Sequence, residues 1–166
     1  METIGGDIRS FTFHDRDTFR KIMGVYSFIE RCVVRLLLDT PQDNIVTIYD
    51  IRHGYIDMEL LDTDYHDKST LLIDISKALD QLHGLNVVYI DLKMENVGYS
   101  KKDNCWKLFD FDVCGIVKEG STSEWLIHPC EYSYFLRYKD QICGDNLYDL
   151  DRIAFREFRA VIGTLQ

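Results

Sequence analysis

The chain has 166 residues, of which 46% are hydrophobic, and this length and composition predict one globular domain with a core of its own. Its 28 acidic residues outnumber its 19 basic ones and give a formal net charge of −9, so we expect no nucleic-acid partner. The sequence has no apolar run of about eighteen residues and no signal peptide. We therefore expect no membrane partner and an intracellular, cytoplasmic location.

Five cysteines are present, an odd number without Cys-x-x-Cys spacing. This pattern favours reduced thiols over a zinc site or a disulfide framework. The cysteines are Cys32, Cys105, Cys114, Cys130 and Cys143.

The amino-terminal part is predicted to form a strand followed by a long helix. Residues 1–16 contain a short apolar alternation that predicts one edge strand. The acidic stretch 14–17 is typical of a helix start, and apolar residues then recur at intervals of three and four. We predict an amphipathic helix from about residue 17 to residue 37, with Lys21 inside it. Its apolar positions are Phe19, Ile22, Met23, Tyr26, Ile29, Val33, Leu36 and Leu37.

A hairpin and a second helix follow. Two apolar segments within residues 45–60 flank a turn at residues 52–54, which predicts a β-hairpin. Ser69 is the predicted cap of a helix that ends at Gly84, with His83 packed at its end. The predicted buried stripe of this helix is Leu72, Ile75, Leu79 and Leu82.

Polar side chains gather directly after the apolar stretch 87–90. Asp91, Lys93 and Asn96 fall within one short loop, and Asp110 follows behind a predicted hairpin of residues 97–109. This order suits phosphoryl transfer. One Asp can orient or deprotonate a hydroxyl, the Lys can neutralise charge on the moving phosphoryl group, and the Asn and second Asp can hold magnesium.

The carboxyl-terminal part is predicted to be irregular over residues 113–141 and helical over about residues 147–163. No element follows this helix to cover its far face, so we expect bare apolar surface there. We consider a homodimer as one way to bury it. The apolar positions of the helix are Ile153, Phe155, Phe158, Val161 and Ile162.

These segments resemble the protein kinase family. The run Asp91-Leu92-Lys93-Met94-Glu95-Asn96 is similar to the catalytic loop His-Arg-Asp-Leu-Lys-Pro-Glu-Asn, and Asp110-Phe111-Asp112 is similar to Asp-Phe-Gly. The resemblance implies ATP and Mg²⁺ as cofactors. It also implies that Asp91 is the catalytic base, Lys93 the transition-state cation of the serine/threonine type, and Asn96 and Asp110 the metal ligands.

The same resemblance assigns candidate residues around the nucleotide. Residues 58–61 correspond to the connector whose backbone meets the adenine, so Glu59 and Leu61 are candidate ATP-binding residues. Glu30 is the candidate for the helix Glu that pairs with a strand lysine at the phosphates, and an ordinary exposed Glu is the alternative. Asp149 is the candidate for the buried carboxylate that holds the catalytic loop, and Asp151 competes with it.

Several features depart from the family pattern. Tyr89 and Ile90 replace the His and Arg of the catalytic loop, so no arginine is available to a phosphorylated activation loop. Asp112 replaces the Gly. No Gly-x-Gly-x-x-Gly and no strand lysine is recognised before the first helix, and no clear Ala-Pro-Glu occurs near residues 131–137.

We therefore predict an α+β, truncated protein-kinase-like fold in a single domain of residues 1–166. Residues 1–60 would form a reduced N-lobe. Residues 61–166 would form a partial C-lobe that ends after its central helix, without the helices that normally follow.

Three functions remain open. The first is a minimal kinase that moves the γ-phosphate of ATP to a Ser/Thr hydroxyl of a protein substrate, because all four polar residues of the chemistry are present. The second is a pseudokinase-type module that regulates a protein partner, because the glycine loop and lysine are missing. The third is a small-molecule kinase of the aminoglycoside-phosphotransferase type, although a Lys two positions after the Asp favours the protein-kinase loop.

Overall fold

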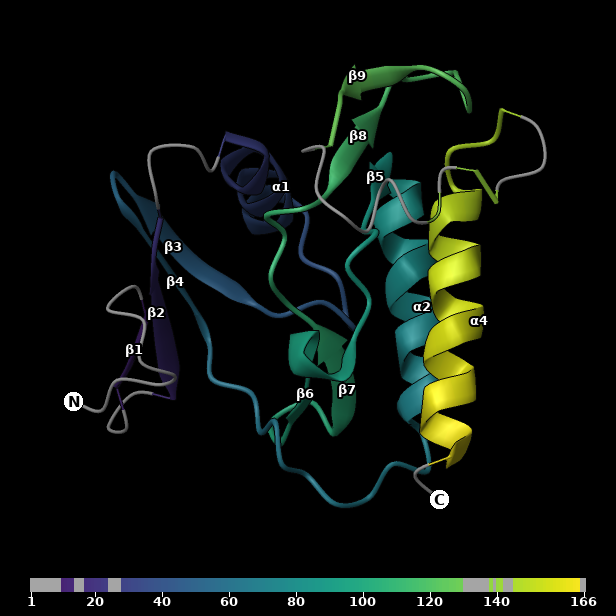
Figure 1. The fold of residues 1–166 in the computed structure, drawn as a ribbon. Helices are drawn as coiled ribbons and strands as arrows, with labels where there is room; N and C mark the ends of the chain where they lie inside the picture. The colour runs from purple at the N-terminus through teal and green to yellow at the C-terminus, as the bar shows by residue number, and fades with distance from the viewer. Residues whose placement is uncertain are drawn as a thin grey trace.

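A computed structural model of the chain describes residues 10–13, 17–23, 28–129, 138, 140–141 and 145–164, with side chains from residue 17 onward. A small antiparallel sheet with one helix lies beside a larger part built on two long helices (Figure 1). The predicted α+β class and kinase-like arrangement are confirmed.

The small sheet contains β1 (Ser10–Phe13), β2 (Thr18–Ile22), β3 (Ile48–Arg52) and β4 (Tyr55–Glu59). Its order is β1-β2-β4-β3, and all neighbours are antiparallel. The predicted edge strand and the predicted hairpin are both confirmed. Gly54 has a φ of +98° in the hairpin turn, a conformation that only glycine adopts without strain.

The predicted helix over residues 17–37 is wrong in its first part. Residues 18–22 form β2, and helix α1 (Phe28–Asp39) begins only at residue 28. The reason is that β2 pairs with β1 on one side and β4 on the other, so its backbone groups are satisfied in the sheet. Asp17 is not a helix cap, because it lies in the turn before β2 and its carbonyl accepts the Leu60 N–H at 2.9 Å. Residues 14–16 lie outside the described residues.

The larger part begins with α2 (Leu71–Gly84), as predicted, although its N-cap is Thr70 and not Ser69. Strand β5 (Val87–Val88) leads into the loop that carries the polar residues, and the short 3-10 helix η1 (Met94–Asn96) ends that loop. Strands β6 (Val97–Ser100) and β7 (Cys105–Leu108) form the predicted hairpin.

The segment after the hairpin is more regular than predicted. Strands β8 (Gly115–Val117) and β9 (Trp125–Ile127) pair with each other, and β8 also pairs with β5, so a three-stranded sheet forms. The pairing satisfies the backbone groups of these strands. The Gly, Ser and aromatic residues of the segment have no alternating pattern that would have predicted them. The candidate Ala-Pro-Glu region near residues 131–137 lies outside the described residues.

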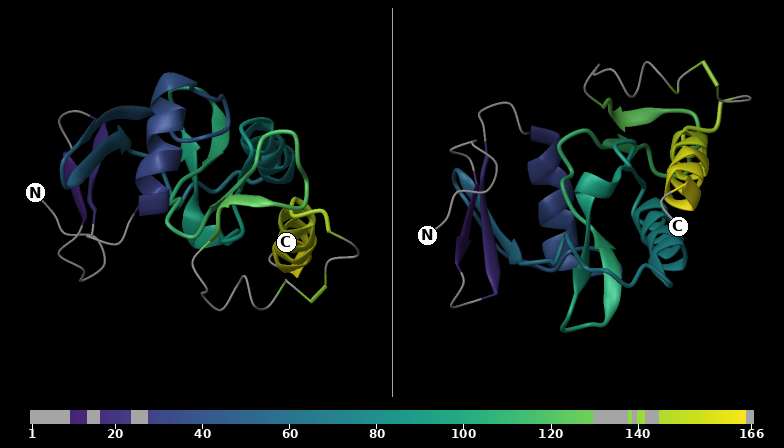
Figure 2. Two further views of the ribbon diagram at one scale, coloured as in Figure 1. Left: turned by 90° about the horizontal axis from the view of Figure 1, so that it is seen from above. Right: turned by 60° about the horizontal axis from the view of Figure 1, so that its bottom comes forward.

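Helix α4 (Asp149–Thr164) ends the described chain and stands beside α2 (Figures 1 and 2). The expectation of a bare apolar face on this helix is largely wrong. Ile153, Phe158 and Ile162 are buried, Phe155 is half-buried, and only Val161 of the predicted set is exposed. One apolar cluster runs from α1 and the small sheet through β5–β8 to α2 and α4. Along the described residues, no helix combines the length and the apolar character needed to cross a membrane.

Candidate active site

Lys21 joins three elements of the fold. Its Nζ lies 2.6 Å from Oε2 of Glu30 in α1 and 2.8 Å from Oδ1 of Asp110, which follows β7. Lys21 projects from β2, and Glu30 is only 2% exposed. The alternative of an ordinary exposed Glu30 is therefore wrong, and so is the expectation that no strand lysine precedes α1.

The charges of this group stabilise one another. Burial alone would lower the pKa of Lys21, but the Glu30 and Asp110 carboxylates outweigh it and raise this pKa above its ordinary value. Burial alone would raise the pKa of Asp110, but the Lys21 ammonium holds it below its ordinary value. Lys21 and Asp110 are therefore both charged at neutral pH.

Asp112, which stands where the family has Gly, adds a second carboxyl beside Asp110. Although the residue is exposed as a whole, partial desolvation of its carboxyl and the charge of Asp110 raise the pKa of Asp112 to about 6. The sequence shows that Asp112 replaces the Gly, but it does not show that the two carboxyl groups interact. Two neighbouring carboxylates make this corner of the site attractive to a cation.

Asp151 holds the loop that carries Asp91, and the preferred candidate Asp149 does not. The Asp151 carboxylate is fully buried and accepts the backbone N–H groups of Tyr89 at 2.8 Å and Ile90 at 2.7 Å. Its Oδ2 also lies 2.7 Å from Nε2 of His83, at the end of α2. Asp149 forms an ion pair with Arg152 on the surface instead. The two positions differ by half a helical turn, and the helix phase decides which one faces inward.

The loop brings Asp91, Lys93 and Asn96 together. The Asn96 Nδ2 donates to the carbonyl of Asp91 at 2.9 Å and to its Oδ2 at 3.0 Å, and Lys93 Nζ lies 3.0 Å from the same Oδ2. The other oxygen, Oδ1 of Asp91, is buried and is the one such side-chain atom without a hydrogen-bond partner among the described residues. A buried carboxylate oxygen with unused acceptor capacity is suited to accept a substrate hydroxyl.

Two hydrogen bonds attach the segment before Asp110 to this loop. The Phe109 N–H donates to the Asn96 carbonyl at 3.1 Å, and the Tyr89 hydroxyl donates to the Phe109 carbonyl. The Tyr89 ring also packs edge-on against Phe111. Asp110 has a φ of +65°, so its backbone is held in the left-handed region by its surroundings.

Ile90 occupies the position of the missing arginine. It is fully buried and has a φ of +71°, which is strained for a β-branched residue. The hydrogen bond from its N–H to Asp151 helps to hold this conformation. The position therefore offers no charge to an activation segment.

The oxygen atoms near Asp110 suit a magnesium ion, which needs few protein ligands, better than a metal ion whose ligands all come from the protein. Among the described residues, no three His, Cys, Asp or Glu side chains are close enough to hold a metal ion. Magnesium commonly takes one or two protein oxygens and completes its shell with water and substrate phosphates. Asn96 donates through its amide nitrogen, so its carboxamide oxygen and the Asp110 carboxylate are the atoms that suit such an ion.

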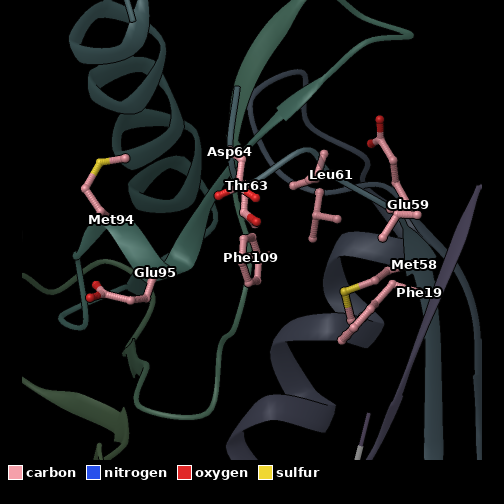
Figure 3. Close-up of a pocket in the computed structure, with 11 residues that line it drawn as sticks. Phe19, Met58, Glu59, Leu61, Thr63, Asp64, Met94, Glu95 and Phe109 are labelled. Atoms are coloured by element: carbon pink, nitrogen blue, oxygen red, sulfur yellow. The ribbon is translucent and has the colours of Figure 1, made fainter. Parts of the chain in front are cut away.

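A cavity of about 510 Å³ lies beside these groups, between the small sheet and the loop that carries Asp91. Figure 3 shows Phe19 and Met58 on one side, Met94 and Glu95 on the other, and Phe109 between them. The connector after β4 supplies part of the wall, and both candidates, Glu59 and Leu61, belong to the lining. The full lining is Phe19, Val46, Met58, Glu59, Leu60, Leu61, Thr63, Asp64, Met94, Glu95 and Phe109.

The Glu59 carboxylate holds the connector against the β6–β7 hairpin. It accepts hydrogen bonds from Lys107 Nζ at 2.9 Å and from the Ser100 hydroxyl. Lys107 is only 1% exposed, and its Nζ also lies 2.5 Å from Oδ2 of Asp103. Glu59 therefore lines the cavity with its backbone and the aliphatic part of its side chain. Lys107 was not predicted from the sequence, because no motif surrounds it.

The connector also approaches β6 closely. A Cβ on Gly98 would lie 2.5 Å from Cβ of Leu61, closer than real Cβ contacts allow. Glycine at this position lets the hairpin pack against the connector and so helps to place the wall of the cavity.

A strand lysine bound to a helix glutamate, next to an Asp-Lys-Asn loop and an open cavity, defines the class of kinase-like proteins. The comparison with known families agrees, because the family described as "Protein kinase domain" matches residues 18–146. The chain belongs to the protein kinase family.

Individual relatives match only parts of the chain. The probable serine/threonine-protein kinase fnkB of Dictyostelium discoideum is 44% identical over 45 residues, 27% of this chain and 8% of that protein. MAP kinase-activated protein kinase 2 of Homo sapiens is 33% identical over 85 residues, 50% of this chain and 20% of that protein. The solved Cydia pomonella Granulovirus kinase PK-1 is 21% identical, with a TM-score of 0.48 over 60% of this chain and 44% of that one. The chain thus spans less than half of each relative's length.

Proposed function

We propose that this chain is a minimal protein kinase that transfers the γ-phosphate of ATP to a Ser or Thr hydroxyl of a protein substrate. The observation that carries this proposal is Lys21 between Glu30 and Asp110. As long as no lysine for the nucleotide phosphates was recognised, the sequence favoured an inactive module almost as strongly as an active kinase. With it, the residues for phosphate contact, metal binding and proton transfer are all available.

In the proposed reaction, Asp91 orients the substrate hydroxyl and takes its proton on Oδ1. The hydroxyl oxygen bonds to the γ-phosphorus as the bond to the bridging β–γ oxygen breaks, and ADP leaves. Lys93 lies beside Asp91 and neutralises charge on the moving phosphoryl group. Bound Mg²⁺ would supply further charge neutralisation, with Asn96 and Asp110 as its protein ligands.

The adenine would occupy the cavity of about 510 Å³ against the backbone of Glu59 and Leu61. Lys21 would turn toward the phosphates, and Glu30 would keep its ammonium in place. We further propose that residues 1–60 and 61–166 act as small and large lobes of one domain around this nucleotide. Because Ile90 replaces the arginine, activity would not require a phosphorylated activation segment.

The competing proposal is a pseudokinase-type module that regulates a protein partner. It is favoured by the absence of Gly-x-Gly-x-x-Gly from the sequence before β2, since Gly5-Gly6 alone cannot cradle phosphates. A module of this type would not transfer the γ-phosphate of ATP, so a direct experiment can distinguish the two proposals.

The experiment combines a thermal-shift measurement with ATP, with and without Mg²⁺, and a radiolabelled phosphate-transfer assay on a Ser/Thr peptide library. A kinase should be stabilised by Mg-ATP and should label peptides, because a ligand bound only by the folded state raises the melting temperature. Stabilisation without labelling would favour the regulatory module. Labelling of an aminoglycoside in place of peptides would favour a small-molecule kinase.

The remaining proposals concern surroundings and assembly. We propose an intracellular, cytoplasmic location, supported by Cys32, Cys105 and Cys114, which are free thiols. A homodimer has lost its main support, because most of the apolar side chains predicted to be bare on α4 are buried within the chain. Sedimentation at micromolar concentration decides between monomer and dimer.

A further inference from the structure

A groove of about 410 Å³ lies between α2 and α4, and none of its lining residues belongs to the nucleotide cavity. Its walls combine apolar and cationic side chains, an unusual surface on a chain with a net charge of −9. We call it the cationic groove. It is lined by Leu72, Ile73, Ser76, Lys77, Phe155 and Arg159.

The cations of α4 form one stripe. Arg152, Arg156 and Arg159 are exposed and lie at i, i+4 and i+7, which places them on one face of the helix together with Phe155. Arg152 is engaged by Asp149. Within the described part of the chain, Arg156 and Arg159 have no ion-pair partner.

Among the described residues, no acid of α4 forms an ion pair with Arg156 or Arg159. Asp149 is taken by Arg152, Asp151 faces inward to Tyr89 and Ile90, and Glu157 accepts the hydroxyl of Tyr138.

Across the groove, Lys77 of α2 is also exposed and has no ion-pair partner among the described residues. Asp80 is the one exposed acid on that face of α2, one turn after Lys77. Lys77 also borders a neighbouring cavity that Asp43, Asp74 and Asp103 line, so carboxylates lie on that side of it. The unpaired positive charge of the groove therefore comes mainly from Arg156 and Arg159.

The floor of the groove is apolar. Ile73 is 60% exposed, and Leu72 and Phe155 are half-buried between the two helices. Covering such side chains is favourable by about 25 cal/mol per Å² of apolar area. Exposed apolar residues rimmed by cations fit a ligand with apolar and anionic sides.

We propose that the cationic groove docks an acidic amphipathic helix of a partner protein. The groove between two side-by-side helices accepts the apolar face of a third, as in helix-in-groove recognition. Carboxylates flanking that face would pair with Lys77, Arg156 and Arg159. This interaction does not depend on ATP and holds for an active or an inactive kinase.

The chemistry favours this occupant over other anions. A nucleic acid or an anionic membrane is a polyanion, which the overall charge of −9 repels at long range. A phosphate backbone would also leave Ile73 uncovered. A short helix with a few carboxylates meets only the local cations, and its apolar side covers Ile73 and Phe155.

The test uses the full chain and a fluorescein-labelled peptide of about eighteen residues, with Leu at helical i, i+3, i+4 and i+7 spacing and Glu on both flanks. Binding is followed by fluorescence anisotropy. Two control peptides are used. One has the same composition in scrambled order, and the other has Lys in place of every Glu. We expect binding of the acidic amphipathic peptide alone, with hydrogen-exchange protection over residues 71–77 and 152–159.

Two matched protein variants locate the site. Arg156→Glu/Arg159→Glu should weaken binding about tenfold or more, because it reverses the charges that face the peptide. Arg35→Glu/Lys102→Glu changes the net charge equally at exposed positions outside the groove and should weaken binding less than about twofold. Arg156→Gln/Arg159→Gln serves as the milder variant, and circular dichroism checks that each variant is folded.

Several results would overturn the proposal. Equal losses in the two charge-reversal variants, or equal binding of the scrambled peptide, would show non-specific charge attraction. Tighter binding of a DNA duplex or of phosphatidylserine vesicles would assign the groove to a polyanion. A dimer in sedimentation that Arg156→Gln/Arg159→Gln disrupts would make a second copy the occupant.

Discussion

The ammonium nitrogen of Lys21 lies 2.8 Å from Oδ1 of Asp110, although 89 positions separate the two residues in the sequence. The same ammonium lies 2.6 Å from Glu30. One cation therefore fixes a strand, a helix and the loop after β7 relative to one another. The contact assembles the upper part of the proposed phosphate site without a glycine-rich loop.

Lys21→Met should lower phosphate transfer by about a hundredfold or more, because the proposed phosphate contact and the anchor for Glu30 are both lost. It should also destabilise the fold by roughly 1–3 kcal/mol, since Glu30 stays buried without its partner. Transfer assays and urea unfolding measure the two effects. Lys118→Met removes an exposed lysine paired with Glu124 and serves as the control, with little change expected in either. Full activity of Lys21→Met would exclude the proposed role.

Asp110→Asn should remove the magnesium-dependent part of ATP stabilisation and leave the fold intact, because it keeps the volume and deletes the charge that a hard cation needs. Thermal shifts with ATP, with and without Mg²⁺, provide the measurement. If mutant and parent gain equal stability from Mg-ATP, Asp110 is not a metal ligand.

Asp91→Ala should abolish phosphate transfer with little change in nucleotide affinity. The carboxylate would act on the acceptor hydroxyl, so its contribution appears mainly in the transition state. Single-turnover transfer and equilibrium ATP binding should be measured on the same preparation. Undiminished turnover in this variant would dismiss Asp91 as the base.

Asp151→Asn should destabilise the protein by about 2–4 kcal/mol, because a buried carboxylate that accepts two backbone N–H groups becomes an amide with one acceptor oxygen. Asp149→Asn is the matched control two positions away. It removes a surface ion pair and should change stability by less than about 1 kcal/mol. Urea midpoints compare the two, and equal midpoints would contradict the assignment of Asp151 as the loop anchor.

The sequence predicted the elements whose patterns are local. The hairpin of β3 and β4, helix α2, the β6–β7 hairpin and α4 follow from periodicity and turn residues, and the loop around Asp91 follows from a motif. Strand β2 was missed because its place depends on pairing with two other strands, which a short apolar pattern does not encode. Once residues 18–22 are recognised as a strand, Lys21 becomes the strand lysine before a helix that carries Glu30.

Contacts between distant residues were the least predictable part of the site. Asp149 and Asp151 differ only in helix phase, and a shift of two positions exchanges the inward and outward residue. Sheet β5-β8-β9 depends on pairing between β5 and a segment about thirty positions later, which gives no local signal. The ion pair of Glu59 and Lys107 likewise joins two hairpins.

Lys107 should be necessary for the shape of the proposed nucleotide cavity, although it does not line it. Its ammonium is buried between Glu59 of the connector and Asp103 of the β6–β7 turn. Burial alone would lower the pKa of Lys107, but these carboxylates raise it above its ordinary value, so the lysine is charged. A charged buried pair fixes the position of its two elements, because separating them leaves a charge without a partner.

Lys107→Met should therefore destabilise the fold by about 3–5 kcal/mol and raise the KM for ATP more than it lowers kcat, because the connector moves while Asp91 stays in place. Lys101→Met is the control, since Lys101 belongs to the same turn but is exposed and paired with Asp62. The double variant Glu59→Gln/Lys107→Met should lose less stability than the sum of the single variants, by about 1 kcal/mol or more, because it leaves no buried charge unpaired. Additive losses, or equal KM values in the Lys107 and Lys101 variants, would show that this ion pair does not position the connector.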